Sequence, residues 1–121
     1  MWCRFPYEEE PGKPGPEPHP GIVRQAFADQ DNNPWVEVVY GTSKDPNRGG
    51  FEYFTVSKVT EMDACNLKYA TRFCFKRLMQ LPWSHEYFQP IPGQPTPIIG
   101  RLSDYGIKLL QMQMAYFQAY G

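Results

Sequence analysis

The sequence predicts a small, mainly β domain that is completed by one C-terminal helix. Several strand-length stretches alternate apolar and polar residues, and the apolar spacing becomes helical only after residue 103. Aromatic residues make up 16% of the chain, a high share that suits half-buried strands. With 121 residues, 41% of them apolar, the chain is expected to form one domain over residues 1–121 with a single core.

The N-terminal part predicts three strands joined by turn-rich connections. Residues 1–6 open with a short apolar strand, and residues 7–20 form an extended loop in which prolines and glycines recur. Residues 21–28 predict a second strand. Residues 29–34, with Asp, Asn, Asn and Pro, predict a turn, and residues 35–43 alternate clearly as a third strand.

The remainder continues as strands and loops before the helix. Residues 44–50 predict a loop, residues 51–57 a strand, and residues 58–66 show no regular pattern. Residues 71–81 predict a long central strand. Because no helix is expected between the strands, the pattern favours a small antiparallel barrel or sandwich.

The strand over residues 71–81 is expected to have two contrasting sides. One side is basic and polar, with Arg72, Lys76 and Gln80, and exposed rings at Tyr69 and Trp83 are nearby in the sequence. A basic strip beside aromatic rings is typical of single-stranded nucleic-acid binding, although a solvated surface explains the charges equally well. The other side is predicted to face the core with four apolar residues: Phe73, Phe75, Met79 and Leu81.

The helix expected over residues 103–120 begins where Ser103 or Asp104 can supply an N-cap oxygen. One stripe, with Ile107, Leu110, Met114 and Phe117, has the spacing of a core-facing surface. A second apolar stripe lies beside it, and the two together make a face wider than one domain contact needs, which predicts a homodimer. The second stripe consists of Tyr105, Leu109, Met112, Tyr116 and Tyr120.

Charge and cysteine content limit the classes of function. A formal net charge of −1 gives no global attraction to nucleic acid, so any such binding requires a local patch. Three cysteines without paired spacing favour a reducing, cytoplasmic location, and no secretory or membrane-spanning segment is expected. The histidines and cysteines lack the close spacing of zinc ligands, so we expect neither a metal site nor a cofactor.

Three segments together resemble the PemK/MazF family of toxin endoribonucleases. Residues 14–23 read PGPEPHPGIV, residues 38–44 read VVYGTSK, and residues 2–6 read WCRFP. They are similar to the family's Pro/Gly-rich loop, to its strand that ends in a small hydroxyl residue, and to its first strand. The order of the remaining elements also fits, so the resemblance spans nearly the whole chain.

The resemblance implies an SH3-like barrel that acts as a homodimer and cleaves single-stranded RNA without metal, through attack by the 2′-hydroxyl. A cognate antitoxin would cover the site. Carried over by position, the catalytic hydroxyl falls on Thr42, with Ser43 beside it. The basic residues Lys44, Arg72 and Lys76 are expected to bind the RNA.

The position of the family's catalytic Arg is occupied by His19. Arginine carries a permanent charge and a forked set of donors, whereas histidine is mostly neutral near pH 7. His19 is therefore predicted either as a general acid or base or as an exposed loop residue without a catalytic role. This departure favours an alternative function, in which a catalytically inactive relative encoded by a phage or mobile element inhibits a protein target.

Overall fold

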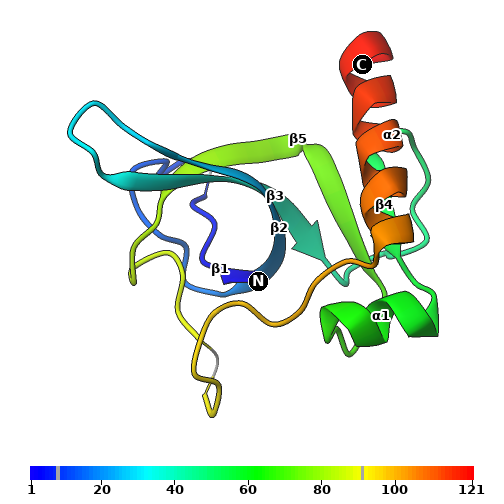
Figure 1. Ribbon diagram of the computed structural model, residues 1–121, viewed down its shortest axis with the longest axis horizontal. Coiled ribbons are helices and arrows are strands. Elements are labelled where there is room, and N and C mark those ends of the chain that lie inside the picture. The colour runs from blue at the N-terminus through cyan, green and yellow to red at the C-terminus, as the bar shows by residue number, and fades with distance from the viewer. Residues whose placement is uncertain (8, 91) are drawn as a thin grey trace.

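The computed structural model of the chain describes residues 1–7, 9–90 and 92–121, and its fold is mainly β, as predicted (Figure 1). Five strands form one antiparallel sheet in the order β1-β2-β3-β5-β4. Neither described helix is long and apolar enough to cross a membrane. The elements are β1 (Trp2–Cys3), β2 (His19–Ala28), β3 (Pro34–Thr42), β4 (Tyr53–Val56), α1 (Val59–Cys65), β5 (Thr71–Pro82) and α2 (Asp104–Tyr120).

The predicted turn between β2 and β3 is confirmed, and Asp29 organises it. One carboxylate oxygen of Asp29 accepts hydrogen bonds from the backbone N–H of Asp31 (2.9 Å) and of Asn33 (2.8 Å). The other accepts one from the indole N–H of Trp35 at 2.9 Å. These bonds hold the pKa of Asp29 below its ordinary value. The predicted loop over residues 7–20 is shorter than expected, since β2 begins at His19, and its residue 8 lies outside the described residues.

Strand β5 bends sharply, which the alternating sequence did not indicate (Figure 1). Val39 of β3 pairs with Leu78, but the next residue of β3 pairs with Cys74, so residues 75–77 have no partner in β3. At the bend the backbone N–H of Phe75 bonds to the carbonyl of Glu52 instead, at 2.8 Å. Extra residues of this kind reverse which side of a sheet the following side chains face.

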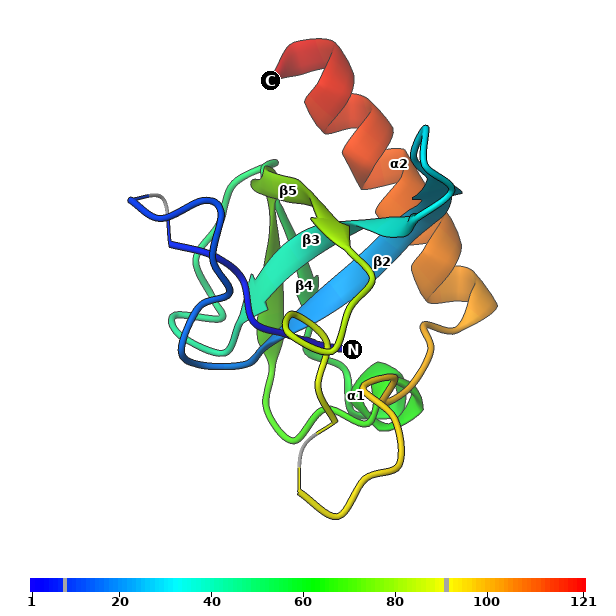
Figure 2. The same ribbon diagram turned by 90° about the vertical axis from the view of Figure 1, so that its left-hand side faces the viewer.

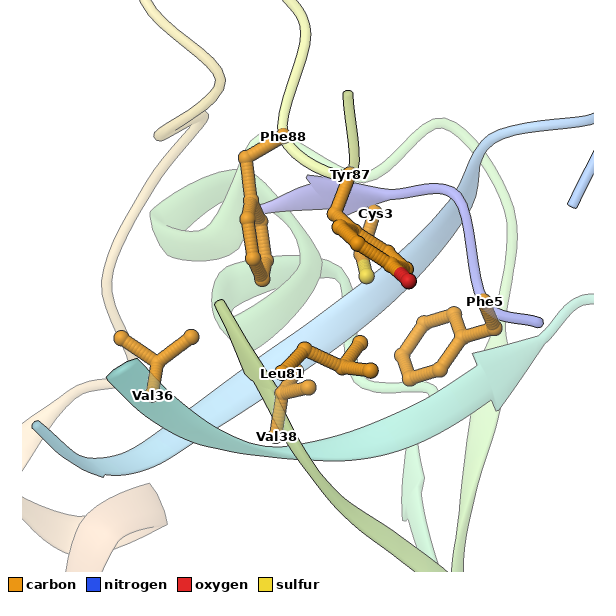
Figure 3. Packing of buried hydrophobic residues seen from close by; sticks show 7 residues of the cluster. All are labelled: Cys3, Phe5, Val36, Val38, Leu81, Tyr87 and Phe88. Carbon is orange, nitrogen blue, oxygen red and sulfur yellow. The ribbon is translucent and has the colours of Figure 1, made fainter. Parts of the chain in front are cut away.

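The sheet consequently separates two apolar clusters rather than enclosing the single core that we expected. Val38 and Val39 are adjacent, both fully buried, and belong to different clusters. The first cluster lies under the N-terminal segment and contains Cys3, Phe5, Val36, Val38, Leu81, Tyr87 and Phe88 (Figure 3). The second lies under α2 and contains Val39, Phe54, Val56, Phe73, Phe75, Leu110 and Met114.

The prediction that one side of β5 faces a common core is therefore wrong. Phe73 and Phe75 are buried in the second cluster, whereas Leu81 is buried in the first and Met79 packs against that cluster. The bend at residues 75–77 causes this change of face. The central position of β5, between β3 and β4, is confirmed.

Helix α1 was not predicted, and it contradicts the expectation that no helix interrupts the strands. It supports the start of α2 through Glu61, whose carboxylate accepts hydrogen bonds from the backbone N–H (2.8 Å) and the hydroxyl (2.5 Å) of Ser103. The Ser103 hydroxyl oxygen in turn accepts a bond from the N–H of Gly106 at 3.0 Å, which confirms Ser103 as the N-cap. A side chain at Gly106 would meet this carboxylate, with an added Cβ 2.9 Å from its Cδ.

Candidate functional site

The sheet face opposite α2 carries Thr42 and Arg72, two of the site residues that the sequence indicated. In the pairing register, Tyr40 of β3 and Tyr53 of β4 both lie across from Cys74 of β5, and Thr42 lies across from Arg72. Directly paired residues point to the same face of a sheet. We call the surface formed by these five residues the tyrosine face.

The Tyr40 ring is surrounded by three side chains from different parts of the chain. The Arg77 guanidinium carbon lies 4.1 Å from the centre of the ring, in a cation–π contact. The His19 ring centre is 5.0 Å away and tilted by 49°, and the Phe5 ring meets Tyr40 edge-on at 5.1 Å. Tyr40 thus holds a cation and an imidazole next to one another.

Arg77 is a functional candidate that the sequence motifs missed. It lies in the bend of β5, among the residues without a partner in β3. Its Nε atom is buried and has no hydrogen-bond partner among the described residues. A buried donor without an acceptor is costly, and the cation–π contact with Tyr40 is the interaction that holds the Arg77 guanidinium. No local signal marks Arg77, because its position depends on the bend.

His19 is the first residue of β2 and is partly buried, so it is not an exposed loop residue. Burial lowers the pKa of His19 below its ordinary value of 6.5; Glu17 opposes this shift, and Arg77 adds to it. The imidazole is therefore neutral at pH 7, with one ring nitrogen free to accept a proton.

The second part of the tyrosine face is built around Tyr53. The Arg72 guanidinium lies 4.7 Å from the Tyr53 ring centre, and that of Arg48 lies 5.8 Å from it. Arg72 Nε donates to the carbonyl oxygen of Lys44 at 2.9 Å, and the backbone N–H of Lys44 donates to the hydroxyl oxygen of Thr42 at 3.1 Å. Thr42, Lys44 and Arg72 are thus connected directly, as members of one site would be.

The remaining predicted residues are less closely connected. Ser43 and Lys76 are exposed, and neither makes a side-chain hydrogen bond or an ion pair within the described part of the chain. His19 and Thr42 lie at adjacent ends of β2 and β3: Gly21 pairs with Tyr40, and extending that register by two residues sets His19 opposite Thr42. The strands remain close there, since a Cβ on Gly41 would approach the Pro20 carbonyl oxygen to 2.8 Å.

The chemistry of the tyrosine face suits a phosphodiester. Aromatic rings hold the guanidinium groups of Arg72 and Arg77, and guanidinium groups match phosphate oxygens in shape and charge. A neutral imidazole and a hydroxyl lie on the same face. Across the described residues, no group of three or more His, Cys, Asp or Glu side chains is arranged to hold a metal ion.

No protein-family model matches the chain, and no curated protein or solved structure is significantly similar to it. The resemblance to PemK/MazF toxins therefore rests on the three sequence segments alone.

Proposed function

We propose that the chain binds single-stranded RNA on its tyrosine face and cleaves it without a metal ion, as a PemK/MazF-like endoribonuclease with an SH3-like fold. The observation that carries the proposal is the contact of Tyr40 with both the Arg77 guanidinium and the His19 ring. This contact pairs a permanent cation with a neutral base on the face that also carries Thr42. These are the groups that phosphodiester transesterification needs.

Each side chain then has a defined role. His19 accepts the proton of the attacking 2′-hydroxyl, and the proton is returned to the departing 5′-oxygen, leaving a 2′,3′-cyclic phosphate. Arg77 donates to the phosphate oxygens as their negative charge grows, which supplies the charge that the family's Arg would provide at position 19. Thr42 already accepts a bond from the Lys44 N–H, so its own hydroxyl proton remains available to the scissile phosphate.

The Tyr53 region extends the RNA site beyond the cleaved phosphate. Arg48 and Arg72 contact the Tyr53 ring, and Lys44 is exposed beside them. These cations would contact neighbouring phosphates, and their local concentration offsets the formal net charge of −1 of the whole chain. Binding should therefore weaken as salt is raised.

A second candidate function is a catalytically inactive relative that acts on a protein target. The specific observation in its favour is His19 at the position of the family's Arg, together with the negative net charge. A cognate antitoxin or another protein target would then occupy the tyrosine face. A cytoplasmic location suits either function.

Cleavage of a long unstructured RNA in EDTA tests the first proposal. We expect the parent chain to cut, and Arg77→Gln and Thr42→Ala each to slow cutting, by about 10²–10³-fold for a lost transition-state donor. Arg101→Gln is the matched control, because Arg101 is exposed and its backbone bonds to Ala64 of α1, away from the tyrosine face. Equal rates in parent and Arg77→Gln would refute the assigned role of Arg77.

His19→Arg separates the two candidate functions. If His19 is the base and Arg77 the cation, His19→Arg removes the base and lowers the rate. If the Arg-to-His difference has disabled the site, the same variant raises an undetectable rate to a measurable one. No cutting by either chain, with tight binding to a protein partner, would reject the nuclease and support the inactive relative.

A further inference from the structure

A groove of about 630 Å³ lies on the α2 side of the sheet, outside the tyrosine face. One wall is β2, the opposite wall is α2, and the segment over residues 98–102 closes one end. In Figure 2, α2 crosses behind the outer part of the β2–β3 hairpin. The floor is apolar, with Ile22, Leu110 and Met114 among its residues.

The strand wall of this groove is an unpaired sheet edge. Strand β2 pairs with β3 over residues 21–23 and 25–28, with a bulge at Arg24, but it pairs with β1 only at His19 and Pro20. Gly21 exchanges backbone hydrogen bonds with Met1, and beyond it the outer edge of β2 has no strand partner among the described residues. An unpaired edge presents N–H and C=O groups that can bond another extended chain.

The groove follows that edge and not one face of the strand. Residues 20–23, which precede the bulge, all line it, although successive strand residues point to opposite faces. The helix wall supplies residues one turn apart, such as Gln111, Ala115 and Gln118. An unpaired strand edge beside an apolar groove can accept an added strand.

The charges along the groove indicate which extended chain would bind. Arg24 and Arg101 line it, and it has no Asp or Glu among its described lining residues. Arg24 is already paired with the buried Glu37, whereas Arg101 is exposed and forms no ion pair within the described residues. An acidic side chain on the ligand would complement Arg101.

We propose that this groove binds an extended peptide of a partner protein, which adds to β2 as a further strand. Alternate apolar side chains of the peptide enter the groove toward Leu110 and Met114, and a carboxylate near one end meets Arg101. The site lies across the sheet from the tyrosine face, so peptide and RNA would bind independently. The proposal does not depend on nuclease activity.

Selection from a displayed library of random peptides on the full chain tests this proposal. We expect enrichment of peptides in which apolar residues alternate with polar ones and an Asp or Glu lies near one end. The enriched peptide, made synthetically, should protect the backbone amides of residues 22–26 from hydrogen exchange. No enriched peptide, or protection confined to another region, would overturn the proposal.

Two alanines of α2 provide a matched pair of variants. Ala115 and Ala119 are both exposed, but only Ala115 lines the groove. Ala115→Trp should fill the groove and weaken peptide binding by at least about tenfold, the equivalent of 1.4 kcal/mol, while Ala119→Trp should bind like the parent. Arg101→Glu should also weaken binding, and more for peptides with an acidic end than for the same peptides with Asn or Gln there.

Equal peptide affinity of Ala115→Trp and the parent would contradict a binding site in the groove. Sedimentation of the peptide-free variants tests whether a second copy of the chain is the occupant. If Ala115→Trp dissociates an oligomer that Ala119→Trp leaves intact, a second copy occupies the groove and the peptide proposal is rejected.

Discussion

In the proposed mechanism, the contact between Tyr40, Arg77 and His19 divides two chemical tasks between two side chains. Arg77 keeps its charge at every physiological pH, whereas burial keeps His19 neutral. The two groups also reinforce this division, because the nearby guanidinium further lowers the pKa of His19. In the PemK/MazF pattern position 19 would carry the cation; here the bend of β5 brings a cation to the same place from elsewhere in the chain.

The lowered pKa of His19 predicts a pH dependence of stability. Between the folded-state pKa and the ordinary value of 6.5, the unfolded chain binds the proton more readily than the folded chain. The contribution of neutral His19 is therefore fully present above 6.5 and is lost as the pH falls through the folded-state pKa. Thermal melts from about pH 7.5 to pH 5 should show a steeper loss for the parent than for His19→Gln. Parallel curves would show that His19 is not desolvated in the folded chain.

At the scale of the elements, β5 links the two apolar clusters, and Phe75 lies at its bend. Its side chain is only 4% exposed, and its ring lies 5.7 Å from that of Phe117 on α2. The ring therefore joins the sheet to the C-terminal helix. Loss of this ring should affect the whole cluster under α2.

Phe75→Ala should lower the free energy of unfolding by about 3–5 kcal/mol, as for other large core truncations. Phe27→Ala is the control, because Phe27 is exposed near the end of the β2–β3 hairpin, where it stacks only loosely on Trp35, at 6.4 Å. Urea denaturation of both variants and the parent measures the difference. A midpoint for Phe75→Ala close to that of Phe27→Ala would contradict the burial of Phe75.

The sequence predicted well those elements that are determined by residues close together in the chain. An apolar run indicated β2, and alternation indicated β3 and β5. Asp29 and its neighbours indicated the turn, and Ser103 or Asp104 indicated the start of α2. Helix α1 was not predicted, because it has only seven residues and none of them is buried, so its sequence lacks an amphipathic pattern. Its contact with Ser103 joins residues that are 42 positions apart.

The same distinction applies to the candidate site. The sequence indicated His19, Thr42 and Arg72, which lie in β2, β3 and β5, three strands that it also predicted. It did not indicate Arg77, because residues 75–77 contain no Gly or Pro that would mark a bend. Strand β5 pairs with β3 on both sides of the bend, and at the bend the backbone N–H of Phe75 bonds to Glu52 instead. This arrangement, which only the three-dimensional structure reveals, brings Arg77 over Tyr40.

At the scale of the whole molecule, three surfaces with different chemistry surround one sheet. The tyrosine face is cationic and aromatic, and the groove beside β2 is apolar with an arginine at its edge. The third surface is the outer side of α2. There the Tyr116 ring lies 4.8 Å from that of Tyr120 and 5.8 Å from that of Phe51.

This outer side of α2 leads us to predict a homodimer, because large contiguous apolar patches are uncommon on monomers. Met112 is 69% exposed, Tyr116 54% and Tyr120 73%, and none of them lines the groove. Light scattering at tens of micromolar should give twice the mass of one chain. Met112→Lys combined with Tyr116→Lys should give a monomer, since two buried cations without partners would oppose association. Lys108→Ala, on the same helix, should leave the dimer intact. A parent chain that has the mass of a monomer at this concentration would refute the dimer and leave the aromatic patch exposed on a monomer.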